Sequence, residues 1–293
     1  MIRERCTKSG KLLEVDFFPV WEDGRRMPTR APKTKKSTEE QAKYNKRQAE
    51  KKLIRLVNAN FDTGDIFMHP TYAPGNAPQS DEEARRDIVN YFRRVKRKRI
   101  SEAKRIKELL KAKPDDKRLK EQLKKLEQPF KYIYVIEKVT YKTGKRKGYD
   151  DWHFHAFLTG GIDRDTLEDM WPYGMRTNAD RYQPEKFGPE SAAKYVSKDP
   201  QGSKRFCYSK NITKPDILPP KDGRISAEGV KRLATLRIDD NEYWERKYKG
   251  YHFIKCYSRY NEYNGHWYVS VIMYKTKEID IKQWEVDEWI TEF

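Results

Sequence analysis

The chain has 293 residues, of which 36% are hydrophobic and 37% are charged, and its formal net charge is +18. This length allows one sizeable core or a core with appended elements, and the charge favours a polyanionic partner. No apolar run is long enough to cross a bilayer and the N-terminus lacks the hydrophobic region of a signal peptide, so we expect a cytoplasmic protein without a membrane partner. Its 19 Tyr and 7 Trp suit stacking on single-stranded bases, or an ordinary core.

Residues 1–60 predict a basic N-terminal extension followed by a helix. Leu12 to Val20 form a β-like stretch, and residues 25–36 are rich in Arg, Lys, Pro and Thr, as in an exposed linker. Ser37 followed by Glu40 is a capping-box pattern, so we expect a helix from there to about Val57.

Residues 61–215 predict a central α+β domain that begins with a strand and a long helix. Asp65 to Tyr72 is short and apolar and precedes Ala-Pro-Gly-Asn, as in a central strand that enters a loop. Ser80 and Glu83 form a second capping box. The helix after them has the apolar stripe of a helix packed on a sheet, with Ala84, Ile88, Tyr91, Phe92 and Val95.

A strongly basic segment follows this stripe. From Arg93 to Lys125 there are 16 Lys or Arg against 5 Asp or Glu. Apolar residues on both sides of Pro114 predict two antiparallel helices, which form a hairpin inserted at about residues 99–128. The charge indicates either a solvated face or a clamp for a DNA backbone. With a basic turn further along, the candidate DNA-binding residues are Arg93, Arg94, Lys96, Arg97, Lys98, Arg99, Lys145, Arg146 and Lys147.

Two strands next predict a metal site. His153 and His155 lie in the β-like run 151–158, where alternate side chains share a face, so both imidazoles point the same way. The preceding β-rich run, 130–137, ends at Glu137, and the turn-like residues 143–148 allow the two runs to pair antiparallel. Two imidazoles and a carboxylate then leave coordination positions open for substrate oxygens. Two structural histidines are the alternative.

The rest of the chain predicts further short elements. A short helix is expected at 163–171, a strand at 174–182, and a helix that opens at Gly188-Pro189 and carries Tyr195 and Lys198 on one stripe. Residues 216–293 predict a C-terminal α/β extension. It contains a helix from Ser226 to about Leu236, a β-hairpin formed by 251–257 and 266–275, and an acidic tail.

Taken in chain order, the strands and candidate residues from about Asp65 to Asp199 resemble those of the HUH endonuclease superfamily. They are most similar to the single-tyrosine Rep proteins, which initiate rolling-circle replication in small phages, plasmids and circular single-stranded DNA viruses. The resemblance implies a five-stranded antiparallel sheet with flanking helices, related to the ferredoxin and RNA-recognition folds. It implies that the metal ligands are Glu137, His153 and His155. It also implies that Tyr195 is the nucleophile, with Lys198 as its partner and Asp199 as an accessory acid.

The first motif of the family departs from its usual pattern in this chain. Thr71 and Tyr72 would lie in that motif, but Met68-His69-Pro70 replaces its usual Thr-Leu-Thr character. His69 is therefore either a structural residue or a contact to DNA or metal.

The resemblance also implies a mechanism. Mg²⁺ or Mn²⁺ orients the scissile phosphate, Tyr195 attacks it, and Lys198 stabilises the developing charge. The expected product is a 5′-phosphotyrosine link with a free 3′-hydroxyl, formed on single-stranded DNA or an origin stem-loop. The sequence has no GxxxxGK[ST] motif, so we expect a host helicase and polymerase, most simply those of a bacterium.

Two alternatives remain open at this point. One is a transposase or plasmid-mobilising relaxase of the same superfamily, which shares the metal site and the tyrosine. The other is a non-catalytic basic nucleic-acid-binding protein in which the histidines are structural. The sequence predicts no oligomeric state.

Overall fold

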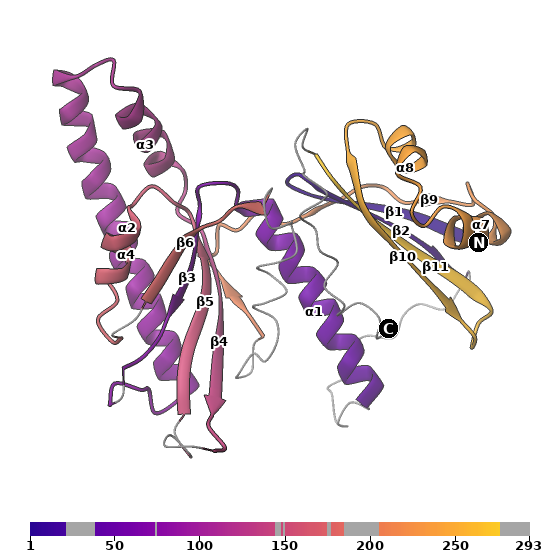
Figure 1. Cartoon of the computed structure of the whole chain (residues 1–293), viewed down its shortest axis with the longest axis horizontal. Helices are drawn as coiled ribbons and strands as arrows, with labels where there is room; N and C mark the ends of the chain where they lie inside the picture. The colour runs from indigo at the N-terminus through magenta and orange to yellow at the C-terminus, as the bar shows by residue number, and fades with distance from the viewer. Residues whose placement is uncertain are drawn as a thin grey trace. The chain divides into compact units, whose positions relative to one another are not determined.

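The computed structural model describes residues 1–21, 39–73, 75–143, 148, 150–174, 177–184 and 205–275 (Figure 1). In these residues the fold is α+β, with six helices and two antiparallel sheets of five and six strands. The chain divides into two compact units: unit 1 combines Met1–Ala59 with Lys214–Phe293, and unit 2 is Asn60–Thr213. The expected linker at 25–36, the helix that opens at 188–189 and the acidic tail lie outside the described residues.

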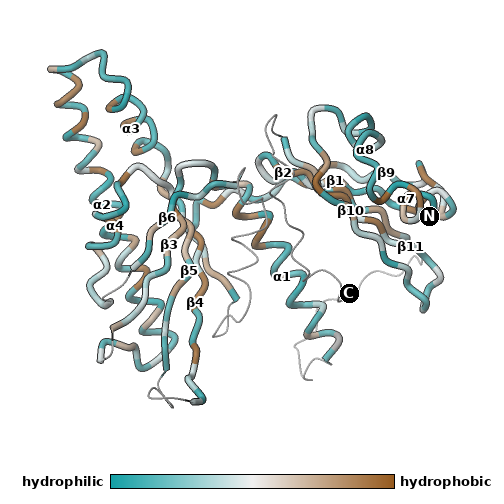
Figure 2. The backbone as a smooth tube through the Cα atoms, in the orientation of Figure 1, coloured by the Kyte–Doolittle hydropathy of each residue, from teal (hydrophilic) through white to brown (hydrophobic). Residues whose placement is uncertain are grey.

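The sheet of unit 2 has the expected five antiparallel strands. In spatial order these are β6 (Thr177–Arg181), β3 (Ile66–Pro70), β5 (Asp150–Leu158), β4 (Tyr132–Thr140) and β7 (Cys207–Tyr208). The predicted strand at 65–72 is therefore internal, and the predicted strand at 174–182 pairs with it along an outer edge. Figure 2 shows hydrophobic stretches concentrated along the strands of this sheet.

One face of this sheet is covered by helices. Helix α2 (Asp81–Ala112) is capped by Ser80, whose hydroxyl accepts a hydrogen bond from the Glu83 amide at 3.2 Å. The stripe predicted for α2 is buried and joins a core with Met68, Phe154 and Ala156 of the strands. Helix α4 (Arg164–Asp169) adds Leu167 to the same core. Periodicity along the chain is enough to specify this packing because each element buries one continuous face.

The expected helical hairpin is also present. Helix α3 (Lys117–Glu127) follows α2 after a short turn, and the acidic residue before it, Asp116, caps α3. The first arm of the hairpin is the continuation of α2, which extends for 32 residues without a break. The hairpin is thus an extension of a core helix, and Figure 2 shows hydrophilic residues over much of it.

Arg99 anchors this hairpin to the sheet. Its side chain is 2% exposed, and its guanidinium donates hydrogen bonds to five backbone carbonyls, of Lys125, Leu126, Gln128, Thr159 and Gly160. The prediction that Arg99 binds DNA is therefore wrong, since the residue is buried and both terminal nitrogens of its guanidinium donate to the protein's own backbone. Burial lowers the pKa of Arg99 to about 10, so it stays charged at neutral pH.

A second contact closes the same junction. The Nζ atom of Lys125 on α3 lies 2.7 Å from the Oδ1 atom of Asp65, just before β3. The same carboxylate accepts a hydrogen bond from the Gly160 amide at 2.9 Å. Arg99 and Lys125 therefore fix the base of the hairpin to unit 2, and the other cations of the hairpin are not needed to hold it there.

Unit 1 has a six-stranded antiparallel sheet drawn from both ends of the chain. Its strands are β1 (Ile2–Ser9), β2 (Leu12–Pro19), β8 (Asp216–Ile217), β9 (Lys221–Asp222), β10 (His252–Asn261) and β11 (His266–Tyr274). The order is β10-β11-β2-β1-β8, and β9 also pairs with β1. The predicted C-terminal hairpin is confirmed as β10–β11. Its pairing with β2, in which Val269 lies opposite Phe17, was not anticipated from the sequence.

Helices cover part of each face of this second sheet. Helices α7 (Ala227–Leu236) and α8 (Asn241–Lys247) bury Leu233 and Trp244 against Phe17 and Val271 on one face. On the other, helix α1 (Glu39–Asn60) contributes Lys51 and Arg55, which pair with Glu14 and with Asp16 on β2. No helix of the described residues is long and apolar enough to cross a membrane.

Candidate metal centre

The register of β4 and β5 brings the three predicted ligands together. Glu137 lies directly opposite His153, and Val135 lies opposite His155, so all these side chains share one face. The alternation predicted for β5 is confirmed, because Trp152, Phe154 and Ala156 are buried in the core on the other face. The helix-covered core thus fixes both strands from behind and leaves the two imidazoles on the opposite face.

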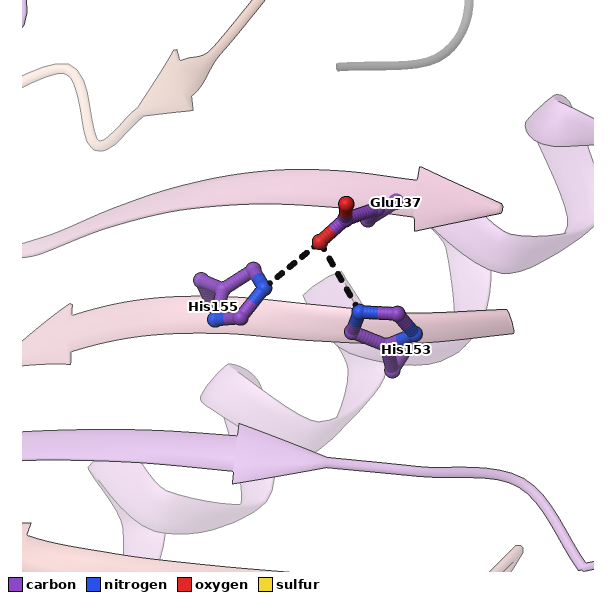
Figure 3. A group of neighbouring side chains, drawn as sticks. All are labelled: Glu137, His153 and His155. Atoms are coloured by element: carbon purple, nitrogen blue, oxygen red, sulfur yellow. Dashed lines mark hydrogen bonds and ion pairs between the residues drawn. The ribbon is translucent and has the colours of Figure 1, made fainter. Parts of the chain in front are cut away.

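The three side chains converge on one point (Figure 3). The Oε2 atom of Glu137 lies 2.9 Å from the Nε2 atom of His153 and 2.9 Å from the Nε2 atom of His155. One donor atom from each residue lies within 4.8 Å of the others. Three donors that point at a common position form one face of a coordination sphere, and the remaining positions stay open.

The three side chains differ in the fraction of their surface that is exposed. The side chain of His155 is 4% exposed, whereas those of His153 and Glu137 are 18% and 19% exposed. Hydrogen bonds from His153 and His155 lower the pKa of Glu137 to about 2, although partial burial opposes the shift. Glu137 is therefore ionised throughout the physiological range, which gives the group the negative charge that attracts a cation.

The surroundings on this face are aromatic. The ring of Phe67 stacks on Phe157 with centroids 4.6 Å apart, and the His69 ring meets the His155 ring edge-on at 4.7 Å. Burial, followed by the neighbouring His155, lowers the pKa of His69 to about 4, so this imidazole is neutral at physiological pH. His69 is beside the three converging residues but is not one of them.

A further acid near this face was not anticipated from the sequence. In the register of β3 and β6, Asp180 lies opposite Phe67 and Asn178 lies opposite His69. The Asp180 carboxylate also acts on His69, whose pKa it raises against the larger effect of burial. Although β6 was predicted as a strand, its partner was not, so nothing in the sequence could place Asp180 near the histidines.

The donor set fits a divalent cation. Imidazole nitrogens are good ligands for transition metals, and a carboxylate suits Mg²⁺ and Mn²⁺. Glu137, His153 and His155 could therefore hold a metal ion.

The remaining candidate residues fall into two groups. Along α2, Arg93, Lys96 and Arg97 are exposed and therefore accessible to a partner, whereas Arg94 and Lys98 are half-buried and contact Met170 and Glu102, respectively. The others lie outside the described residues, so their predicted roles stay predictions; they are Lys145, Arg146, Lys147, Tyr195, Lys198 and Asp199.

Comparisons with known proteins leave the family open. No family model matches the sequence, and neither a curated protein nor a solved structure is found to match the chain.

Proposed function

We propose that this chain is a metal-dependent DNA-nicking and joining endonuclease of the HUH type, of the single-tyrosine Rep kind. The observation that carries the proposal is the convergence of Glu137, His153 and His155 on one face of a five-stranded antiparallel sheet. A structural histidine pair would need neither a shared carboxylate nor a partly exposed position. His153 and Glu137 are partly exposed, so a metal ion held by the group would be accessible to a phosphate oxygen.

The proposed reaction is a transesterification at phosphorus. Glu137, His153 and His155 would hold a divalent cation, which would supply Lewis-acid stabilisation of the charge on the scissile phosphate. The Tyr195 oxygen bonds to phosphorus while the bond from phosphorus to the 3′ oxygen breaks, and in net terms the proton of the Tyr195 hydroxyl is transferred to the departing 3′ oxygen. The products are a 5′-phosphotyrosine and a free 3′-hydroxyl. The reverse attack by a 3′-hydroxyl restores the phosphodiester, so one site both nicks and joins.

The charges on α2 support a nucleic-acid substrate. Near the sheet, exposed Lys96 and Arg97 have no carboxylate partner among the described residues, and Arg93 donates only to the amide oxygen of Asn90. Further along the hairpin, Arg105, Lys107 and Lys111 are each paired with a glutamate. Cations without acidic partners are the ones that neutralise phosphates. We therefore place the DNA backbone along the first of these groups.

Labelled single-stranded stem-loop DNA, incubated with the full chain and Mn²⁺ and resolved on a denaturing gel, tests the proposal. We expect a protein band carrying the label, which is abolished by EDTA, by Glu137→Gln and by Tyr195→Phe. The matched control is Tyr208→Phe, because Tyr208 is 40% exposed on β7 of the same sheet. This control should form the adduct at the wild-type level.

The other outcomes discriminate between the alternatives. An adduct that persists in Tyr195→Phe but is lost in Tyr208→Phe moves the nucleophile to Tyr208. Tyr182 is a poor substitute, since it is 5% exposed and packs edge-on against Phe157. DNA binding without any adduct, from a library of random loops, contradicts an enzyme and favours the non-catalytic binding protein. A transposase or relaxase would give the same adduct from a different DNA target.

A further inference from the structure

One face of the unit 1 sheet carries aromatic rings and cations in adjacent positions. Tyr257 on β10 lies opposite Ser270 on β11, Ser270 lies opposite Asp16 on β2, and Asp16 lies opposite Arg5 on β1. Laterally paired residues share a face, so these four side chains form one row across the sheet. The opposite face is buried under α7 and α8.

The next row along the strands repeats this pattern. Arg259 lies opposite Tyr268, and Arg3 lies opposite Phe18. Tyr268 and Phe18 are each two residues from the Ser270–Asp16 pair, so this row is on the same face. Read across β10, β11, β2 and β1, the second row is a cation, two rings and a cation. We call the two rows together the aromatic face, defined by Arg3, Arg5, Asp16, Phe18, Tyr257, Arg259, Tyr268 and Ser270.

The rings of the aromatic face are incompletely covered. Phe18, Tyr257 and Tyr268 are half-buried, and Arg259 is exposed. Only a few residues away, Leu12 and Tyr274 are 1% and 2% exposed. The sheet therefore has a closed end, where α1 pairs with Glu14 and also with Asp16 of the first row, and a more open end at the second row, which presents Phe18 and Tyr268.

Several contacts hold the open end in shape. The Tyr268 hydroxyl accepts a hydrogen bond from the Asn264 side-chain amide at 2.9 Å. The guanidinium carbon of Arg5 lies 4.9 Å from the Phe18 ring centroid, and the Asp16 carboxylate accepts a hydrogen bond from the same guanidinium at 2.9 Å. A tyrosine ring on β11 and an arginine plane on β1 are thus fixed on the same face of the sheet, with β2 between them. Both are surfaces on which nucleic-acid bases stack.

The charge around these rings is complementary to a polyanion. The cations Arg3, Arg5, Lys255 and Arg259 lie on or beside the aromatic face, against the carboxylates of Asp16 and Asp222. Arg259 has no ion pair among the described residues, and it lies on β10, an edge strand of the sheet. Rings that lie between cations suit a single strand, whose bases stack on the rings and whose phosphates contact the cations.

We propose that the aromatic face of unit 1 is a second nucleic-acid-binding site, which takes a single strand through base stacking on Tyr268 and phosphate contact with Arg259. This site is separate in sequence from the proposed nuclease residues of unit 2, and it requires no metal. It gives the protein a means of holding unpaired DNA or RNA whether or not unit 2 cleaves it.

Crosslink mapping on the wild-type full chain tests the proposal directly. The probe is a 5-iodouracil-substituted single strand of about 16 nucleotides, the upper end of the length that one single-strand-binding fold covers. It is irradiated with the protein in EDTA, and the crosslinked peptides are identified by mass spectrometry. We expect crosslinks at Tyr268 or Tyr257 in addition to any in unit 2. Crosslinks confined to residues 60–213 would overturn the proposal.

Variants then test the stacking and the charge separately. Tyr268→Ala should weaken binding of the same strand about 5- to 150-fold, which corresponds to about 1–3 kcal/mol for one stacked base, whereas Tyr268→Phe keeps the ring and should bind within about twofold of the wild type. Tyr44→Ala is the matched control, since Tyr44 is an exposed tyrosine on α1. Arg259→Gln should weaken binding more than Arg232→Gln on α7, although each removes one exposed charge.

A comparison of single-stranded DNA, single-stranded RNA and duplex identifies which nucleic acid binds to the aromatic face. DNA and RNA strands of the same sequence are compared by fluorescence anisotropy, with the matching duplex as a third sample. Tighter binding of either single strand than of the duplex supports stacking and identifies the partner. An equal loss of single-strand affinity in Tyr268→Ala and Tyr44→Ala, or binding of the duplex alone, would contradict the proposed single-strand site. Because the assay contains EDTA, an inactive or absent nuclease in unit 2 does not alter its outcome.

Discussion

Glu137 contacts His155 along a diagonal of the β4–β5 ladder, at 2.9 Å, while it lies directly opposite His153. One carboxylate therefore serves two histidines that are separated by a full period of the strand. The position of Glu137 in the register therefore brings three donor atoms, one from each residue, into one group.

The first prediction concerns metal affinity. Isothermal titration should show Mn²⁺ bound more tightly than Mg²⁺, because two of the three donors are imidazoles and Mg²⁺ prefers oxygen ligands. His155→Ala and Glu137→Gln should each weaken Mn²⁺ binding at least about tenfold, or about 1.4 kcal/mol. His252→Ala is the control, since His252 lies on β10 of unit 1. Loss of affinity in the control as well would indicate non-specific binding.

The second prediction concerns Arg99. Arg99→Met preserves most of the side-chain volume but leaves five backbone carbonyls without their donor, so we expect the free energy of unfolding to fall by about 3 kcal/mol or more. Arg97→Met on the same helix should change it by less than about 0.5 kcal/mol, because Arg97 is exposed. Urea unfolding measures both. A stable Arg99→Met variant would mean that water satisfies those carbonyls.

The third prediction separates two kinds of cation on the hairpin. Replacement of Arg93, Lys96 and Arg97 by Gln should reduce the dependence of single-strand binding on salt. The slope of log K against log salt should become shallower by about 0.7 for each phosphate that the protein no longer neutralises. Anisotropy titrations over a range of salt give this slope.

The control for that triple variant replaces three cations that already have acidic partners. Arg105, Lys107 and Lys111 pair with Glu102, Glu127 and Glu108, so their removal takes away the same charge with a smaller effect on the slope. An equal slope in both triple variants and in the wild type would indicate a solvated arm.

The fourth prediction concerns pH and the ionic cluster of unit 1. Asp16 has a pKa of about 2, although its burial alone would raise the pKa, because Lys51, Ser270 and Arg5 stabilise the carboxylate. A depressed acid pKa stabilises the fold above the pKa of the unfolded chain, near 4, and this contribution is lost as the pH falls toward 2. The shift corresponds to about 2 kcal/mol.

Denaturation of Asp16→Asn at several pH values checks this. The variant should be less stable than the wild type at about pH 7, and the difference should shrink between about pH 4 and pH 2. Asp222→Asn is the control on the same sheet, because Asp222 is an exposed residue that pairs with Arg3. A stability difference independent of pH would mean that packing of the amide, and not the charge of Asp16, causes the loss.

Local patterns were enough to predict the candidate site. The alternation in β5, the apolar stripe of α2 and the capping residue Ser80 each depend on neighbours within a few positions of the chain. Such patterns report which side of an element is buried, so they placed His153 and His155 on one face. The pairing of Glu137 with them followed because only residues 141–149 separate the two strands in sequence.

Contacts between distant segments could not be predicted in this way. Arg99 is one of sixteen cations in a run, and nothing in the run distinguishes it from exposed Arg97; its acceptors at Thr159 and Gly160 come from a loop sixty residues later. The sheet of unit 1 depends on pairing between β2 and β11, which no local signal specifies. Burial of a charge and assembly of a sheet from two chain ends are properties of tertiary structure.

Because unit 1 combines two segments that are distant in the sequence, its sheet cannot form completely until the second segment has been synthesised. Unit 2 begins at Asn60 and ends at Thr213, and these two residues are hydrogen bonded in both directions at 2.8 Å, so this unit can close as soon as it has been translated. Strand β2 is made before unit 2, yet its neighbour β11 is made only after unit 2 has been translated. Until then β2 has an unpaired edge, and such edges promote aggregation. Ribosome-bound chains that stop before residue 266 should therefore aggregate, although unit 2 is already folded.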